Sequence, residues 1–185
     1  MVEASASAGF SLAEAECHFN GWNGLEKDQK TGFDMSVTIE QDTNGYQWAQ
    51  FRLGYCCCYG QGTDEDKNKG FEWLTKSVEQ GNSPAMYSLA SCYQLGLGCV
   101  QNDNKALEWF EKSASLGYSE AMYILGKCYE YGRWGVTKDL NKAREWYTKA
   151  AAQGHALALQ NLDALDNPDD NDDIQSSSPP RIMEV

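Results

Sequence analysis

The sequence has 185 residues, of which 42% are apolar, so it is long and apolar enough to build a hydrophobic core. Its formal net charge of −12 disfavours binding to nucleic acids and to anionic membrane surfaces, because both partners attract Lys and Arg. No segment approaches the roughly 20 consecutive apolar residues of a membrane helix, and the N-terminus lacks the basic and apolar regions of a secretion signal. We therefore expect a cytoplasmic protein with no nucleic-acid partner and no direct membrane insertion.

The N-terminal part of the chain predicts a short leader followed by a divergent helical unit. We expect residues 1–9 to be flexible and residues 10–48 to form a degenerate first repeat. Gly21-Trp-Asn-Gly24 resembles a turn that returns later, at Gly132-Arg-Trp-Gly135. We therefore expect the repeat pattern to begin upstream of residue 49, where the clear repeats start.

Three clear tandem units follow, at residues 49–84, 85–120 and 121–157, and the first two are each 36 residues long. The recurring positions are Ala49, Ala85 and Ala121 at the start; Leu53, Leu89 and Leu125 four residues later; Trp73, Trp109 and Trp146 in the second half; and Gly81, Gly117 and Gly154 at the end. An insertion in the turn at 132–135 accounts for the extra residue of the last unit.

Each unit predicts two helices joined by a turn. In the first helix, apolar residues recur every four residues and form one stripe. The second helix carries the Trp and ends at a Gly that suits a left-handed cap. Because neither helix can bury its apolar face alone, we expect the units to stack, with the core formed by Leu53, Leu89, Leu125, Trp73, Trp109 and Trp146. We expect residues 158–165 to form a capping helix and residues 166–185 a disordered acidic tail.

The third unit resembles the Sel-1-like repeat family, a relative of the tetratricopeptide repeats. The family pattern is matched by Ala121, Leu125, Gly126, Tyr129, Gly132, Gly135, Val136, Asp139, Lys142, Ala143, Trp146, Lys149, Ala150, Ala151 and Gly154. The resemblance is strong over residues 49 to 165 and weak over 10 to 48, and it departs from the pattern at Cys57, Gly70 and Cys99. It implies an all-α right-handed superhelix of stacked antiparallel helix pairs that acts as a non-catalytic scaffold or adaptor for other proteins.

Helical rotation places one face of each first helix opposite the buried stripe, where it would line a concave groove. The predicted groove residues are Phe51, Tyr55, Cys58, Tyr59, Tyr87, Ser91, Gln94, Leu95, Tyr123, Lys127, Glu130 and Tyr131. Aromatic residues dominate interface hot spots, so an apolar or extended peptide is the expected ligand. A clamp for a terminal carboxylate is not expected, because Lys127 is the one basic residue of the set. The alternative that these rings pack against the neighbouring unit stays open.

Seven cysteines raise the possibility of disulfides or a metal site. Cys56, Cys92 and Cys128 hold equivalent positions in successive units, about one helix-packing distance apart and too far for a bridge. Cys56, Cys57 and Cys58 point in different directions around one helix and cannot converge on one ion. We therefore expect buried free thiols in a reducing compartment, no metal and no cofactor.

Catalysis would need a nucleophile, a base and an orienting group brought together. The histidines, His18 and His155, lie far apart along the repeats, and His155 is expected in a solvated loop. Some cysteine-rich bacterial relatives are assigned β-lactam hydrolysis, but their paired, bridged cysteines are not reproduced here. A hydrolase, and a structural subunit that stacks into a larger assembly, remain the alternatives to the scaffold.

Charged residues recur in the turns before the second helices, at Asp66, Asp103 and Asp139 and at Lys69, Lys105 and Lys142. They could form a charged binding strip. Helix capping and solvated faces explain them more simply, since carboxylates accept hydrogen bonds from the first amides of a helix.

Overall fold

The computed structural model describes residues 12–22, 26–43 and 46–167, and the side chains at 42 and 43 are not described. It divides into two compact units, residues 1–118 (unit 1) and residues 119–185 (unit 2). The described residues form helices and turns without a strand, so the predicted all-α fold of paired helices is confirmed for them. The leader at 1–9 and nearly all of the tail at 166–185 lie outside these residues.

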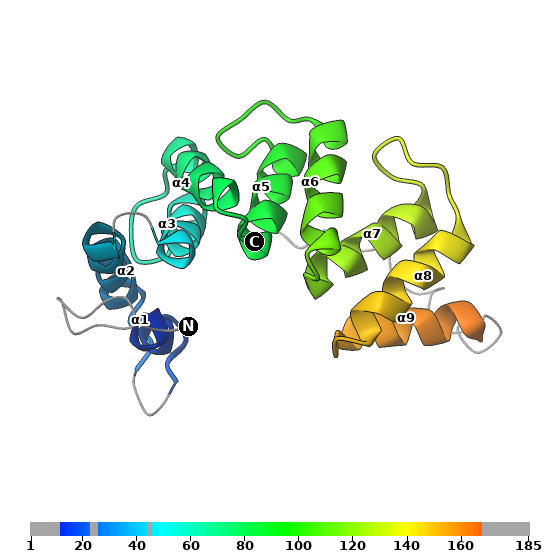
Figure 1. Ribbon diagram of the computed structural model, residues 1–185, viewed down its shortest axis with the longest axis horizontal. Coiled ribbons are helices and arrows are strands. Elements are labelled where there is room, and N and C mark those ends of the chain that lie inside the picture. Colours follow the sequence, from blue (N-terminus) through cyan, green and yellow to red (C-terminus); the bar gives the residue numbers. More distant parts are fainter. Residues whose placement is uncertain (1–11, 23–25, 44–45, 168–185) are drawn as a thin grey trace, which may run out of the picture. The chain divides into compact units, whose positions relative to one another are not determined.

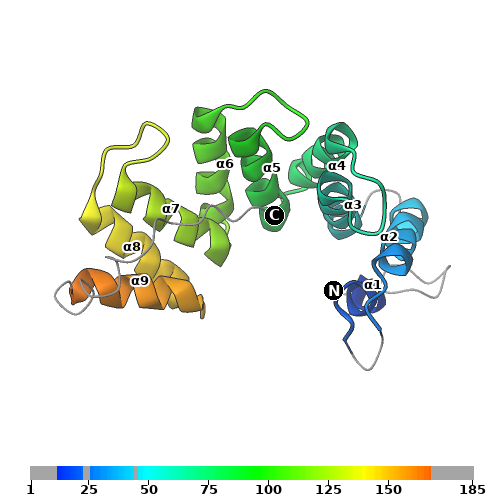
Figure 2. The same cartoon turned by 180° about the vertical axis from the view of Figure 1, so that it is seen from behind.

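The described part of unit 1 consists of three helical hairpins that follow one another in chain order (Figure 1). The helices are α1 (Leu12–Asn20), α2 (Gln29–Thr43), α3 (Gln47–Tyr59), α4 (Lys67–Glu79), α5 (Ser83–Leu95) and α6 (Asp103–Ser115). Each odd-numbered helix packs against the even-numbered helix that follows it, and α2 and α4 also pack against the start of the next hairpin. The view from behind shows the same order (Figure 2).

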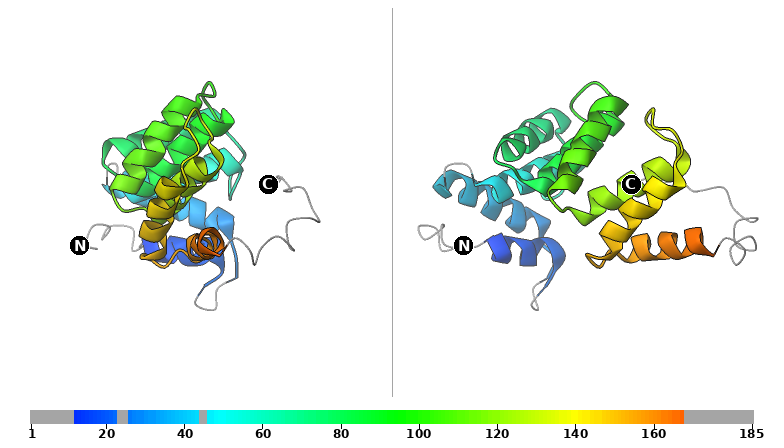
Figure 3. Two further views of the ribbon diagram at one scale, coloured as in Figure 1. Left: turned by 90° about the vertical axis from the view of Figure 1, so that its right-hand side faces the viewer. Right: turned by 45° about the vertical axis from the view of Figure 1, so that its right-hand side comes forward.

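Unit 2 contains the last clear repeat and one further helix, namely α7 (Ser119–Tyr131), α8 (Leu140–Ala151) and α9 (Ala156–Asp166). Helix α8 packs against both α7 and α9 (Figure 3). The helix expected at 158–165 therefore begins two residues earlier and ends one residue later in the structure, and it covers one side of α8.

The core of each clear repeat includes the recurring Leu and the residue that follows the Trp. Leu53, Leu89 and Leu125 are at most 2% exposed, and Leu74, Phe110 and Tyr147 at most 1%. The tryptophans are only half-buried, which corrects the predicted core at Trp73, Trp109 and Trp146. Each indole instead lies beneath the ammonium group of the Lys three residues later, 4.1 to 4.2 Å from the ring centroid, in the pairs Lys76–Trp73, Lys112–Trp109 and Lys149–Trp146.

The expected capping by turn residues occurs, with one change of residue. The side chains of Asp66 and Asp139 accept hydrogen bonds from the first amides of α4 and α8. At α6 this role belongs to Asn102, whose Oδ1 accepts from the Lys105 amide at 3.0 Å, and Asp103 is already the first helical residue. Lys105 and Lys142 extend over Tyr93 and Tyr129, each at 5.2 Å from the ring centroid.

Glycine allows the close approaches on which the stacking depends. A methyl group on Gly126 would lie 2.5 Å from the Tyr147 ring, and one on Gly54 would lie 2.7 Å from Leu74 Cγ. In the turns of unit 1, Gly62 lies directly against the Gln29 carbonyl group, and Gly98 lies in the same way against the Lys67 carbonyl group. Neighbouring hairpins are therefore joined by backbone-to-backbone contact at the start of α2 and of α4.

Candidate functional site

Four aromatic side chains form a continuous row along α3. Trp48, Phe51, Tyr55 and Tyr59 are spaced three or four residues apart, so they fall on one side of the helix. Successive ring centroids are 6.3, 6.4 and 4.7 Å apart. Trp48 is 39% exposed and the other three rings are half-buried. We call this set the α3 aromatic row.

Trp48 was missed by the sequence reasoning, because it precedes the first residue of the repeat by one position. Its spacing of three residues from Phe51 was the signal that could have found it. Trp48 is also the most exposed ring of the row, so it is the member best placed for contact with another molecule.

The row ends beside α5. Burial raises the pKa of Tyr59 to about 12, and the ionisable groups of Cys92 and Tyr87 on α5 contribute in the same direction. Phe51 and Tyr59 pack against an apolar cluster that includes Leu89 and Cys92 of α5. The α3 aromatic row and the neighbouring side of α5 therefore form one surface within unit 1.

The predicted groove residues of α5 are partly used for packing. Tyr87 contacts the rings of Phe110 and Tyr118, both at 5.4 Å between centroids, and is half-buried. Ser91 donates a hydrogen bond to the Tyr87 carbonyl oxygen, and Gln94 is half-buried. Leu95, at the end of the helix, is 59% exposed. One face of this helix thus offers a mixture of polar and apolar contacts.

In unit 2 the equivalent side of α7 is tied to its own hairpin. Tyr123 contacts Tyr147 at 5.8 Å and stacks on the imidazole of His155 at 4.5 Å. The Lys127 ammonium lies 5.6 Å from the Tyr123 centroid. Glu130 accepts a hydrogen bond from the Tyr147 hydroxyl, and burial together with this carboxylate holds the pKa of Tyr147 well above its usual value. The Glu130 carboxylate is therefore already engaged within the unit.

Tyr131 follows at the end of α7 and is 53% exposed. Partial burial, and a hydrogen bond to Glu130, raise the pKa of its hydroxyl to about 12. Its exposed ring and the half-buried Lys127 are the parts of this face that remain open to contact.

Arg52 is the basic residue on the same helix as the aromatic row. Its guanidinium forms an ion pair with Glu16 and lies 4.8 Å from the Phe19 ring centroid and 6.0 Å from that of Phe51. The side chain is 18% exposed. Its positive charge is thus compensated by Glu16 rather than offered to an acidic ligand.

The structure places Cys58 in the interior, although helical rotation predicted it in the groove. Cys58 is 1% exposed, whereas the residues at the same repeat position, Gln94 and Glu130, are half-buried. Its Sγ lies 3.9 Å from Sγ of Cys92. The expected groove therefore loses one member, and two thiols from different repeats come into contact.

The seven cysteines all lie in the described part of the chain, and none of them forms a disulfide. Five are at most 2% exposed, namely Cys56, Cys57, Cys58, Cys92 and Cys128, and burial raises the pKa of Cys56 to about 12. Cys17 and Cys99 are partly exposed. Among the described residues, no group of three or more Cys, His, Asp or Glu side chains is arranged to hold a metal ion.

His155 is a structural residue rather than the solvated loop residue that was expected. It is half-buried, and its Nδ1 accepts a hydrogen bond from the Ala158 amide at 3.2 Å, which caps α9. One face of the ring is covered by Tyr123. This nitrogen is already committed to the cap, so it is poorly placed to serve as a general base.

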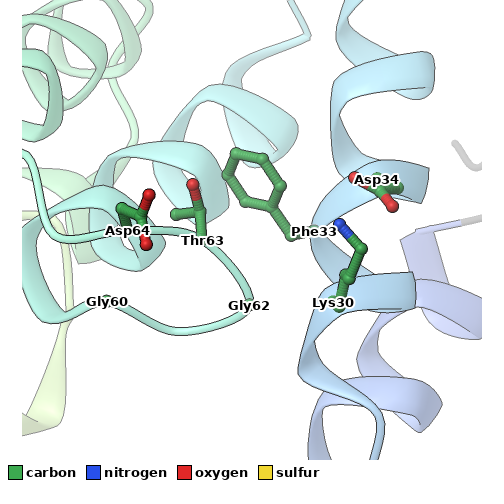
Figure 4. A pocket seen from close by; sticks show the side chains of 7 residues that line it. All are labelled: Lys30, Phe33, Asp34, Gly60, Gly62, Thr63 and Asp64. Atoms are coloured by element: carbon green, nitrogen blue, oxygen red, sulfur yellow. The ribbon is translucent and has the colours of Figure 1, made fainter.

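An open depression of about 500 Å³ lies between α2 and the turn after α3 in unit 1 (Figure 4). Figure 4 shows Lys30, Phe33 and Asp34 on the helix facing the turn. The lining residues are Lys30, Phe33, Asp34, Gly60, Gly62, Thr63 and Asp64. Their charged groups are exposed to solvent, and this shallow site lacks an enclosed set of polar groups of the kind that binds small molecules.

Comparisons with known proteins identify a family and solved relatives. A family model described as Sel1 repeat matches residues 6–35, 49–82, 83–118 and 119–155. A Sel1 repeat protein from Oxalobacter formigenes is similar over 83% of this chain, with 28% identity and a TM-score of 0.71. A protective antigen of uropathogenic Escherichia coli that displays an SLR fold is similar over 83% of this chain, with 32% identity and a TM-score of 0.69.

The chain corresponds to 61% of the Oxalobacter structure and to 32% of the Escherichia structure. A comparison with curated proteins gave no match. Among the described residues, no helix combines the length and the apolar character needed to cross a bilayer.

Proposed function

Because the chain belongs to the Sel1 repeat family, as its sequence predicted, we propose that it is a non-catalytic scaffold that binds an extended segment of a partner protein. Proteins of this family are generally interaction scaffolds. The binding surface within unit 1 is the α3 aromatic row together with the adjacent side of α5. The observation that carries the proposal is the row itself, four rings in side-by-side contact with Trp48 39% exposed.

The chemistry of this surface favours an apolar or aromatic segment. Aromatic side chains supply large contact areas with few rotatable bonds, so they lose little entropy on binding. The Tyr hydroxyls and Ser91 can also form hydrogen bonds to the backbone of an extended ligand. Arg52 forms an ion pair with Glu16, so negative charge on a ligand adds little to its affinity for this surface.

Unit 2 offers a second set of contacts in this proposal. Lys127 and the exposed ring of Tyr131 are the residues of α7 that can reach a ligand, whereas Tyr123 and Glu130 mainly hold the hairpin together. We therefore propose that substitutions at Tyr123 and Glu130 reduce the stability of the protein more than they reduce its affinity for the ligand.

The net charge of −12 supports a protein ligand rather than a nucleic acid. Seven cysteines outside disulfides, five of them buried, support a reducing compartment such as the cytoplasm.

The test is a quantitative pull-down in which the immobilised full chain is compared with Trp48→Ala and Tyr55→Ala variants. Truncation of a hot-spot aromatic costs about 2 kcal/mol or more, which is roughly a 30-fold loss of affinity. We expect both variants to lose the same captured proteins. Val100→Ala is the matched control, because Val100 is an apolar residue that is 88% exposed and lies outside the row.

Unchanged capture by Trp48→Ala and Tyr55→Ala, with helical content retained by circular dichroism, would refute this binding surface. Capture of further copies of the same chain alone, with a matching increase in mass on gel filtration, would instead favour a structural subunit of an assembly.

A further inference from the structure

The thiols of Cys58 and Cys92 meet inside unit 1, although they belong to successive repeats. Cys58 lies in the last turn of α3 and Cys92 near the end of α5, and their Sγ atoms are 3.9 Å apart. Both side chains are about 1% exposed. They belong to one apolar cluster with Leu74 and Leu89, and Tyr59 packs against that cluster.

A glycine makes room for this pair. The residue corresponding to Gly70 is Ala106 in the next repeat and Ala143 in the one after it. A methyl group on Gly70 would overlap Sγ of Cys58 and would lie 2.9 Å from the Cys58 backbone nitrogen. The Cys58 sulfur therefore fills the space that an alanine methyl group fills elsewhere, and this directs it toward α5.

The two thiols are unlike in their proton affinity. The Cys58 and Cys92 sulfurs are within weak hydrogen-bonding distance, and either thiol can donate. This contact holds the pKa of Cys58 below its usual value and raises the pKa of Cys92. Cys58 is therefore the better nucleophile of the pair, and Cys92 is positioned to react with it.

We propose that Cys58 and Cys92 form a reversible disulfide when the protein encounters hydrogen peroxide, which links helix α3 covalently to helix α5. A disulfide requires the sulfurs to approach to about 2.05 Å, so the two side chains together close a gap of about 2 Å. Side-chain rotation within the cluster supplies this movement. The proposal does not depend on the proposed function.

The reaction balances with one peroxide molecule. The Cys58 thiolate attacks one peroxide oxygen, the O–O bond breaks, and the products are a sulfenic acid and, after protonation, water. The Cys92 sulfur then attacks the sulfenic sulfur, the S–O bond breaks, and the departing hydroxide takes the Cys92 proton as a second water. Each sulfur loses one electron, and the two electrons reduce the peroxide. A thiol reductant reverses the cross-link by exchange.

The experiment treats the folded full chain with hydrogen peroxide, blocks the remaining thiols with N-ethylmaleimide, and maps tryptic peptides without reduction. Cleavage after Arg52, Lys67, Lys76 and Lys105 places the two cysteines on separate peptides, 53–67 and 77–105. We expect these peptides to appear joined, with a mass two hydrogens below the sum of the two peptides and the maleimide groups on Cys56, Cys57 and Cys99. Dithiothreitol should separate them.

Single-residue controls identify the sulfurs involved. The joined peptide should persist in Cys56→Ser, Cys57→Ser and Cys99→Ser, and should disappear in Cys58→Ala and Cys92→Ala. Fragmentation of the wild-type joined peptide gives the same assignment without any variant, so a variant that fails to fold leaves the test intact. The proposal would be overturned by a joined peptide that survives in Cys58→Ala or by a bridge between Cys92 and Cys99. The absence of any bridge in the oxidised folded chain would overturn it as well. A bridge that forms equally well from all three cysteines of 56–58 in the folded chain would also overturn it.

Discussion

The neighbouring residues Trp109 and Phe110 allow the corrected core to be tested directly. The sequence alone favoured Trp109 as the core residue, but Phe110 is 1% exposed and Trp109 is half-buried. Truncation of a buried Phe to Ala costs about 3 to 5 kcal/mol, because the lost contacts leave a cavity. Truncation of Trp109 removes about half of the roughly 200 Å² that an indole can bury, which corresponds to about 2.5 kcal/mol, and solvent fills the space.

Phe110→Ala should therefore destabilise the protein more than Trp109→Ala, by about 1 to 2 kcal/mol. For a chain of this size, the loss at Phe110 corresponds to a decrease in melting temperature of roughly 10 °C. Thermal and urea unfolding followed by circular dichroism measure both variants under the same conditions. Leu74→Ala and Trp73→Ala provide an independent pair in the previous repeat, with the same order expected. If the Trp variants are equally or more destabilised than their partners, the assignment of the core to the residue after Trp is wrong.

Three further predictions concern packing, capping and titration. Gly126→Ala should destabilise unit 2 by about 1 to 3 kcal/mol in urea unfolding, because the added methyl group would lie 2.5 Å from the Tyr147 ring, and an unchanged midpoint would contradict this close approach. Asp139→Ala should cost about 0.5 to 2 kcal/mol through the lost cap of α8, whereas Asp103→Ala, outside the cap of α6, should cost less in the same assay. The pKa of Tyr59 is about 12 in the folded chain and about 10 when unfolded, so its contribution to stability is complete below about pH 10 and is lost as the pH rises toward 12. Tyr59→Phe should reduce this alkaline loss, and identical pH dependence of unfolding in the two proteins would show that Tyr59 titrates normally.

The repeat spacing was sufficient to predict the helical hairpins, because Leu53, Leu89 and Leu125 recur where one face of a helix must be covered. The same spacing could not distinguish Trp from the residue after it, since both are large and apolar and adjacent positions differ by about 100° around the helix. The rotation of the helix against its partner decides which of the two enters the core. That rotation is a property of the packed hairpin.

The candidate site was predicted in part for a similar reason. Helical rotation found Phe51, Tyr55 and Tyr59, but it also assigned Cys58 to the groove. The position of Cys58 depends on the missing methyl group at Gly70, which belongs to a different helix. The residue pattern of one helix carries no information about space left by a glycine on another helix. The contacts between helices could therefore be found only in the structure.

The backbone contact at Gly62 has a consequence for how the repeats can diverge. Because the turn touches the Gln29 carbonyl group rather than a side chain, the contact imposes no particular side chain at that end of α2. A hairpin whose sequence departs far from the family pattern can therefore keep the same spacing to the next hairpin. This contact thus leaves the residue choice at position 29 free, while the glycine of the following turn carries the constraint.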